Sequence, residues 1–174
     1  MTRLTPAQTH RAAGVLLAAA TGDALGAGYE FTHPHPDQPI AMIGGGLGNF
    51  APGEWTDDTS MTVAITEVTA TGVDLRTPEG LDAVAAGFVR WYDSGPADIG
   101  TQTRRVLSAR DTSAAAMQAT AAALPGRTAG NGSLMRTAPV ALAYLHDPVA
   151  RAQAAAAVSA LTHPDPHATE ACQI

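Results

Sequence analysis

Apolar residues recur three, four and seven positions apart along most of the chain, which is the spacing of one face of an α-helix. Alternating runs rich in Val, Ile and Thr, which are typical of strands, are hard to find. The pattern predicts an all-α, compact multi-helix fold. No linker or internal repeat interrupts it, so we expect a single domain over residues 1–174. The clearest helix is expected over 57–71, with a buried face formed by Met61, Ala64, Ile65 and Val68.

Helix start and stop signals divide the rest of the chain. Thr5 is expected to cap the first helix, with Gln8 placed to complete a capping box. A helix opening at Thr77-Pro78 should turn Leu81, Val84, Ala85, Phe88 and Trp91 toward a core. Others are expected after Ile99, over 114–124, over 148–161 and from Pro166. One continuous helix after Ser133 should carry Leu134, Ala138, Ala141, Leu142 and Leu145.

The first helix contains the apolar run "RAAGVLLAAATGDALGA", which could pass for the core of a secretory signal. We favour a buried helix, because the run is too short to span a bilayer and the helical pattern continues through Gly22 and Asp23. The segment "THPHPDQPIAMIGGGLGNFAPGEW" follows it. This loop is long for a compact domain, so we expect it to carry function.

Composition narrows the class of partner. The formal net charge is -6, and no run of Lys and Arg is longer than Arg104-Arg105, so a nucleic-acid polymer is not an expected partner. No membrane association is expected either. Cys172 is the only cysteine, which excludes an internal disulfide framework and favours a reducing, cytoplasmic location.

The stretch "GEWTDDTSM" admits two interpretations. Thr56 could cap the following helix, with Asp57 and Asp58 in the first turn, where the helix dipole favours negative charge. Alternatively, these carboxylates and the neighbouring hydroxyls could bind Mg²⁺, Mn²⁺ or Ca²⁺, because a cation would relieve the repulsion between adjacent acids. Spacing alone leaves the two interpretations equally supported.

Three other segments carry candidate chemistry. Glu30 lies between Tyr29 and Phe31, and apolar surroundings raise the pKa of a carboxyl toward values suited to proton transfer, although a solvent-facing Glu is the commoner case. "AGNGSLMR" could bind an anion through backbone N–H groups, with Arg136 adding a charge-assisted bond. His163 and His167 have zinc-like spacing, but the prolines between them disfavour a shared helical face.

Five segments, in this order, resemble the ADP-ribosylglycohydrolase family, which includes the hydrolase that reactivates dinitrogenase reductase: "GDALG…YEF", "GEWTDDTSM", "DIGTQTRRVL", "GNGSLMRTAPVAL" and "THPDPHATEAC". The resemblance runs from about Gly14 to Cys172. It implies an all-α fold and hydrolysis of the bond between the anomeric carbon of ADP-ribose and a modified side chain or related conjugate, with two Mg²⁺ or Mn²⁺ ions. The implied partner is ADP-ribose or an ADP-ribosylated protein.

The resemblance also implies roles for single residues. Thr56, Asp57 and Asp58 match the metal-binding motif, and Glu30, together with Asp58, is assigned to catalysis. The residues implied to bind substrate are Gly100, Asn131, Gly132, Ser133, Met135 and His163.

One departure limits the resemblance. Family members carry a later "GGDTD"-like motif with further metal ligands, and this chain has no such segment. We therefore expect either the N-terminal part of a longer protein or a short form that has lost half of its metal site. The first is completed by a C-terminal segment of the same protein or by another copy of the chain. The second would bind ADP-ribose, or serve a structural role, without catalysis.

Overall fold

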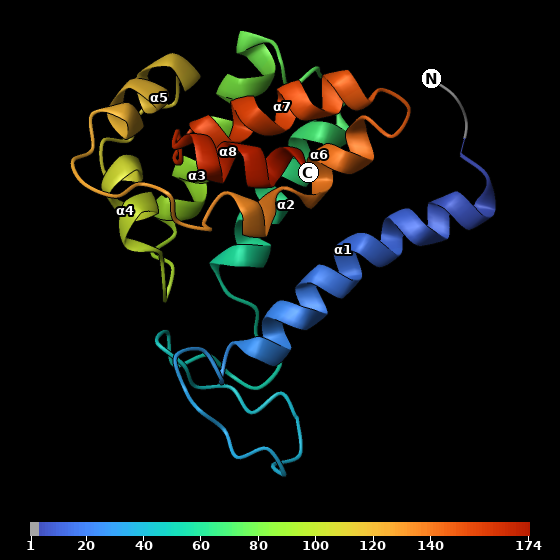
Figure 1. Cartoon of the computed structure of the whole chain (residues 1–174), viewed down its shortest axis with the longest axis vertical. Helices are drawn as coiled ribbons and strands as arrows, with labels where there is room; N and C mark the ends of the chain where they lie inside the picture. The colour runs from blue at the N-terminus through green and yellow to red at the C-terminus, as the bar shows by residue number, and fades with distance from the viewer. Residues whose placement is uncertain (1–3) are drawn as a thin grey trace.

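The computed structural model describes residues 4–174, and these residues are helical with connecting loops (Figure 1). Within them the only β-type pairing is an isolated antiparallel bridge between Gly45 and Phe50. The prediction of an all-α fold is confirmed. The elements are α1 (Pro6–Gly26), α2 (Asp57–Ala70), α3 (Pro78–Asp93), α4 (Thr101–Leu107), α5 (Ala114–Ala122), the 3₁₀ helix η1 (Leu134–Arg136), α6 (Ala138–Ala143), α7 (Pro148–Ala160) and α8 (Pro166–Gln173).

The predicted helix starts coincide with side-chain caps. Thr5 accepts from the backbone N–H of Gln8, whose side chain completes the capping box. Thr77 caps α3, and Asp147 accepts from the N–H of Ala150 at the start of α7. Each cap satisfies a backbone donor that the helix itself leaves free.

The core lies between α2, α3, α5, α6 and α7, with α8 against α7. All four residues of the predicted α2 face are buried there. On α3, Val84, Ala85 and Phe88 are fully buried, and Leu81 and Trp91 pack partly exposed against them. Alanines supply much of the α7 surface, so this helix approaches its neighbours closely.

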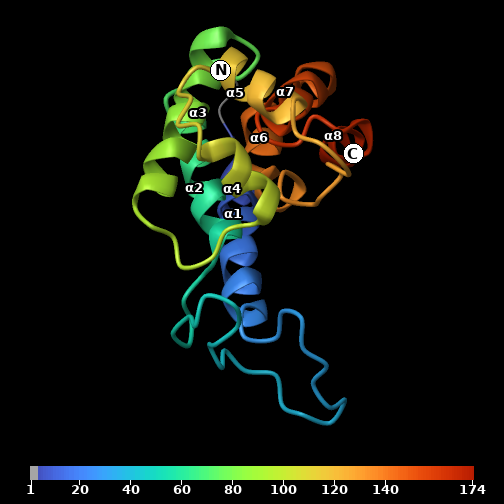
Figure 2. The ribbon, with the colours of Figure 1, turned by 90° about the vertical axis from the view of Figure 1, so that its left-hand side faces the viewer.

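The prediction that α1 is buried is wrong. α1 is a helix, but Ala24 is its only buried residue and Leu17 is 67% exposed. Figures 1 and 2 show α1 extending away from the other helices, with the loop after it at the far end of the molecule. Its main neighbours within residues 4–174 are α2 and α6, which cannot cover a helix of 21 residues. Over the same range, no helix is both long and apolar enough to cross a membrane.

The segment after Ser133 also differs from the prediction of one continuous helix. The chain forms η1 and starts again as α6, whose second position is Pro139. Proline lacks the N–H that a continuing helix needs, and it disfavours helical geometry in the residue before it. The expected face is wrong too, because Leu134 and Leu145 are 47% and 40% exposed. The break lets Met135 line the cleft described below and directs Arg136 into the core.

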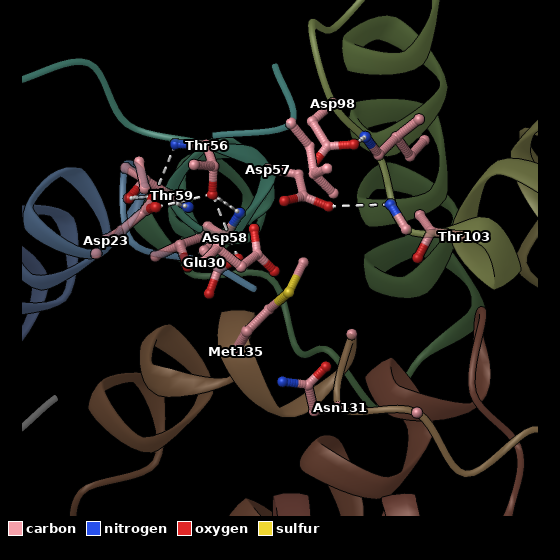
Figure 3. Close-up of a pocket in the computed structure, with 18 of the residues that line it drawn as sticks. Asp23, Glu30, Thr56, Asp57, Asp58, Thr59, Asp98, Thr103, Asn131 and Met135 are labelled. Atoms are coloured by element: carbon pink, nitrogen blue, oxygen red, sulfur yellow. Dashed lines mark hydrogen bonds between the residues drawn. The ribbon is translucent and has the colours of Figure 1, made fainter. Parts of the chain in front are cut away.

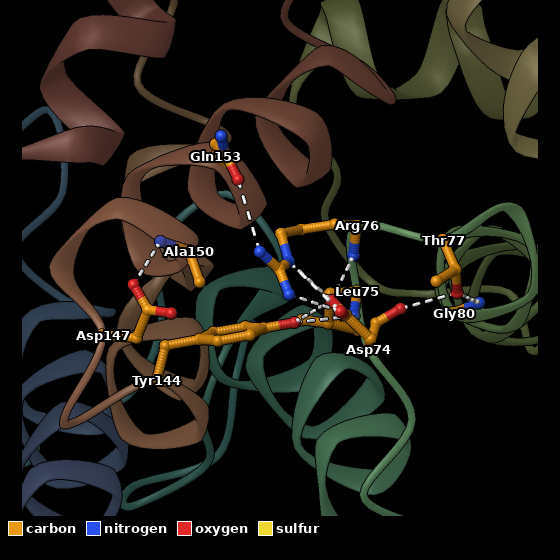
Figure 4. A network of polar contacts seen from close by, with 9 residues as sticks. All are labelled: Asp74, Leu75, Arg76, Thr77, Gly80, Tyr144, Asp147, Ala150 and Gln153. Atoms are coloured by element: carbon orange, nitrogen blue, oxygen red, sulfur yellow. Dashed lines mark hydrogen bonds and ion pairs between the residues drawn. The ribbon is translucent and has the colours of Figure 1, made fainter.

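A polar network joins the α2–α3 turn to the end of α6 (Figure 4). Asp74 accepts from Arg76 Nη2 at 2.6 Å and from the Tyr144 hydroxyl at 2.7 Å, and that hydroxyl accepts from the N–H of Leu75 at 2.8 Å. The hydrogen bonds from Arg76 and Tyr144 hold the pKa of Asp74 well below its usual range. None of these residues lines the cleft, so the network supports the fold alone.

Candidate functional site

A cleft of about 940 Å³ opens where the end of α1, the start of α2, the start of α4 and the 130–135 segment meet (Figure 3). Its volume is within the range of small-molecule sites. Its two sides differ in chemistry. We call the acidic wall the set Asp23, Glu30, Thr56, Asp57, Asp58, Thr59 and Asp98, and the glycine wall the set Gly130, Asn131, Gly132, Met135 and His163.

Asp23 clamps the end of α1 onto the start of α2. Its Oδ1 accepts from Thr56 Oγ1 at 2.7 Å, and its Oδ2 accepts from the backbone N–H groups of Thr56 and Thr59 at 2.9 and 3.1 Å. Oδ2 also accepts from Thr59 Oγ1 at 2.6 Å. These four bonds occupy both carboxylate oxygens and fix the position of the first turn of α2.

Thr56 is the N-cap of α2, as one of the two interpretations expected. Its Oγ1 accepts from the N–H of Asp58 at 3.4 Å. Its single hydroxyl proton lies between Asp23 Oδ1 at 2.7 Å and Asp58 Oδ2 at 3.4 Å, and the shorter contact takes it. Thr56 therefore connects the hydrogen-bonded carboxylate of Asp23 to the carboxylate of Asp58.

Asp57 and Asp58 occupy the first turn of α2 and lack a cationic partner among residues 4–174. Asp57 Oδ2 accepts from the N–H of Gly100 at 3.3 Å, which ties the α4 start to the acidic wall. Burial, followed by the charges of Asp23 and Asp57, raises the pKa of Asp58 to about 6. Burial also raises the pKa of Asp57. In the part of the chain that the structure describes, no Lys or Arg forms an ion pair with an acid of this wall.

Glu30 lies in the turn after α1 and faces the same cleft. Partial burial, then the charges of Asp98, Asp57 and Asp23, raises its pKa. The direction agrees with the expectation from the sequence, although neighbouring carboxylates contribute beside desolvation. A raised pKa makes this carboxylate a better proton acceptor than an ordinary Glu, although its side chain remains exposed.

The acidic wall fits a hard divalent cation in the kind of donor that it offers. Carboxylate and hydroxyl oxygens are the ligands of Mg²⁺ and Mn²⁺, and uncompensated negative charge favours binding of a cation. The number of ligands is smaller than a closed site needs. Across residues 4–174, no group of three His, Cys, Asp or Glu side chains is placed to hold one metal ion.

The glycine wall is shaped by the absence of two side chains. A Cβ at Gly132 would lie 2.8 Å from His163 Cε1 and 3.0 Å from Nε2, so only glycine lets the loop approach this ring. A Cβ at Gly130 would lie at an ordinary 3.5 Å from Nε2. His163 is 2% exposed, and burial followed by the charge of Arg136 lowers its pKa to about 4.

Two residues of the "GNGSLMR" segment that the sequence suggested as ligand-binding, Ser133 and Arg136, do not line the cleft. Ser133 is 1% exposed, and its Oγ contacts Ser159 Oγ at 2.8 Å and Cys172 Sγ at 3.4 Å behind the loop. Its substrate-binding role stays a prediction, and its side chain is not among those that line the cleft. The expectation that Arg136 adds a bond to a bound anion is wrong, because Arg136 is fully buried against the Phe88 ring.

The structure brings the other predicted residues together. Glu30, Thr56, Asp57 and Asp58 line one side of the cleft, and Asn131, Gly132, Met135 and His163 line the other. Gly100 also lines the cleft, beside Asp57. Three residues of the acidic wall were not assigned from the sequence: Asp23, Thr59 and Asp98. Asp23 and Asp98 each lie within a segment noted above, "GDALG" and "DIGTQT", but their partners are distant in sequence.

A family model described as ADP-ribosylglycohydrolase matches residues 4–174. The chain is 36% identical over 181 residues to ADP-ribosylarginine hydrolase Tri1 of Pseudomonas putida, covering 98% of this chain and 46% of that protein. It is 34% identical to ADP-ribosyl-[dinitrogen reductase] glycohydrolase of Rhodospirillum rubrum, covering 96% and 56%. A solved structure described as an ADP-ribosylglycohydrolase-related protein complex matches with a TM-score of 0.68 and 34% identity, covering 94% and 52%. The chain thus spans about half the length of these relatives.

Proposed function

The chain belongs to the ADP-ribosylglycohydrolase family, and from this premise we propose that the cleft binds an ADP-ribosyl group and hydrolyses the bond that joins it to a modified side chain. The observation that carries the proposal is the pairing of the two walls in one cleft. Within residues 4–174, carboxylates without counter-cations line one side of the cleft, and a glycine-rich loop and one buried imidazole line the other. ADP-ribose has matching halves, a ribose that metal ions can hold and an anionic diphosphate.

Thr56, Asp57 and Asp58 would hold the cations, Mg²⁺ or Mn²⁺, because no cationic side chain within residues 4–174 pairs with their oxygens. Such an ion, when bound, lowers the pKa of water and stabilises negative charge on ribose oxygens. Asp23 is engaged in a different task, since its Oδ2 accepts three hydrogen bonds and its Oδ1 accepts one from the start of α2. It holds Thr56 in place.

Glu30 would orient the attacking water and accept its proton, which its raised pKa suits. The positive charge that develops at the anomeric carbon would be stabilised by the nearby carboxylates of the acidic wall. On the other wall, the backbone of Asn131 and Gly132 would bind the diphosphate, and Met135 would cover the adjoining ribose. Gly100 lies close to Asp57 and would let the ligand pass between the walls.

The substrate that we propose is ADP-ribosylarginine, because one relative that matches nearly the whole chain bears that substrate in its name. The test is release of ADP-ribose from an ADP-ribosylated arginine peptide by this chain, with Mg²⁺ or with EDTA. Turnover that requires the metal supports the proposal. Asp57→Ala and Asp58→Asn should each lower kcat by about 100-fold or more.

A matched control is available on α3. Like Asp57 and Asp58, Glu79 is an acid in the first turn of its helix, but it is exposed and lies outside the cleft. Glu79→Gln should therefore leave turnover unchanged. Full activity of Asp58→Asn would exclude the metal assignment, and equal loss in both variants would indicate a general effect of first-turn charge on the fold.

A second candidate function is binding of ADP-ribose without hydrolysis. The lack of three converging metal-ligating side chains within residues 4–174 favours it. Calorimetric titration with ADP-ribose separates the two candidates, because a non-catalytic binder would take up the ligand with or without Mg²⁺ and release no product from the modified peptide.

A further inference from the structure

The guanidinium of Arg136 is a buried charge to which the proposed reaction gives no task. It is fully buried and has no carboxylate within ion-pair distance among residues 4–174. Its plane faces the Phe88 ring at 4.4 Å, and Nη1 lies 3.4 Å from Met61 Sδ. Its Nε has no hydrogen-bond partner in the described range. Burying a cation in this way is costly, so the bonds that it does make need an explanation.

One of those bonds is short and has a fixed direction. Arg136 Nη2 lies 2.6 Å from Thr162 Oγ1. A guanidinium can only donate, so the hydroxyl accepts. Thr162 is fully buried, and the other group within reach of its hydroxyl is His163 Nδ1 at 2.7 Å. The hydroxyl proton is satisfied only if it is donated to that nitrogen, which must then be unprotonated.

The tautomer of His163 follows from this direction. A neutral imidazole with a free Nδ1 carries its proton on Nε2. Nε2 makes no hydrogen bond within residues 4–174 and faces the Gly130–Gly132 loop, on the side of the ring that lines the cleft. The wall therefore offers an uncharged N–H donor beside the loop amides, with the cation held behind it.

We propose that Arg136 is a positioning residue that acts through Thr162 to fix His163 as the Nε2–H tautomer, so that the imidazole donates to an oxygen of the ligand at the glycine wall. The identity of that ligand rests on the proposed function, whereas the tautomer does not. A cation at the surface of this wall would bind any anion. A neutral donor of fixed direction selects an oxygen at one position.

The direct test reads the tautomer in the metal-free chain labelled with ¹⁵N in its histidine rings. His163→Gln identifies the resonances of His163 by their loss. We expect a pyridine-type Nδ1 and a pyrrole-type, protonated Nε2 at neutral pH, without ligand. A protonated Nδ1, alone or in an imidazolium, would overturn the proposal.

Two pairs of variants separate positioning from packing. Thr162→Val removes the hydroxyl at nearly constant shape, and Thr162→Ser keeps it. We expect a mixture of tautomers in the first and the wild-type tautomer in the second. Arg136→Met should also give a mixture of tautomers if it folds. If it does not fold, the result for Thr162→Val alone decides the test. An unchanged tautomer in folded Thr162→Val or Arg136→Met would overturn the proposal.

Titration with ADP-ribose then tests whether the Nε2–H of His163 donates to the ligand. Thr162→Val should raise Kd about 3- to 10-fold, the value of one neutral hydrogen bond, while Thr162→Ser stays within about 2-fold of the wild type. Equal Kd values for the wild type and Thr162→Val would refute the donor role. Absence of ADP-ribose binding in the wild type would count against the proposed function instead, because the tautomer is measured without ligand.

Discussion

The two walls of the cleft handle charge in opposite ways. The acidic wall gathers carboxylates at the surface of the cleft, with no counter-cation in the described part of the chain, and burial raises the pKa of Asp57 and Asp58. The glycine wall keeps its cation, Arg136, in the core and presents uncharged groups. Under the proposed function, the acidic wall would hold a cation, and the glycine wall would bind polar oxygens of the same ligand.

The walls also differ in what holds them. The acidic wall depends on hydrogen bonds that Asp23 of α1 accepts from Thr56 and Thr59 at the start of α2. The glycine wall depends on close packing of a loop against the His163 ring. Substitutions at Asp23 and Gly132 therefore test the comparison through different kinds of interaction.

The largest effect on stability is expected from Asp23→Ala. It removes an acceptor that serves two backbone and two side-chain donors at the start of α2, so the free energy of unfolding should fall by about 2–4 kcal/mol. Urea denaturation followed by circular dichroism measures the loss. Asp37→Ala, at an exposed loop acid, is the control and should change it by less than about 0.5 kcal/mol. A loss in Asp23→Ala no larger than in the control would show that this wall does not depend on the clamp.

Much of this frame was predictable, because its signals are local. The stripe Met61, Ala64, Ile65 and Val68 repeats within one helix, and the caps at Thr5, Thr77 and Asp147 act within a few residues of themselves. The exposure of α1 was not predictable in the same way, because an apolar run in the sequence does not reveal whether another element covers the helix. A helix break near Pro139 could be suspected, because proline lacks a backbone N–H. The exposure of Leu134 could not, because it results from the 3₁₀ turn η1 that forms before the break.

The site residues differ in the same respect: those adjacent in sequence could be predicted together, and those with distant partners could not. Thr56, Asp57 and Asp58 are adjacent, so their shared location was visible in the sequence. The clamp by Asp23 spans 33 residues to Thr56, and no local pattern reports it. Arg136 looked like a ligand for an anion because its distance along the chain from the Gly-rich loop is short. Its burial depends on Phe88, which comes from a different helix.

The glycine wall yields the next largest effect. Gly132→Ala would place a Cβ 2.8 Å from a ring that Thr162 and the core hold in position, so either the loop or His163 must move. We expect a loss of about 1–3 kcal/mol in stability and weaker binding of ADP-ribose. Gly130→Ala is the matched control, since its Cβ would meet Nε2 at an ordinary 3.5 Å. Equal effects of the two substitutions would contradict the close packing inferred for this wall.

The smallest effect is a pH dependence with opposite signs on the two walls. The folded-state pKa of Asp58, about 6, lies above its ordinary 3.8, so the folded state binds the extra proton and stability from this group falls as pH rises from about 4 to 6. The pKa of His163, about 4, lies below its ordinary 6.5, so the unfolded state binds the extra proton and stability from this group rises over about the same window.

The two contributions have opposite signs, so the wild type should gain only about 1 kcal/mol of stability between pH 4.5 and 6.5, and each variant should reveal the contribution of the other wall. In EDTA, Asp58→Asn should gain about 2 kcal/mol of stability on going from pH 4.5 to 6.5, because the His163 contribution remains. His163→Gln should lose about 1 kcal/mol over the same range, a smaller value because solvent screens the partly exposed Asp58. His167→Gln, at an exposed histidine, should parallel the wild type. Denaturant midpoints across this range measure all four proteins, and slopes of the same sign in Asp58→Asn and His163→Gln would show that the walls are not electrostatic opposites.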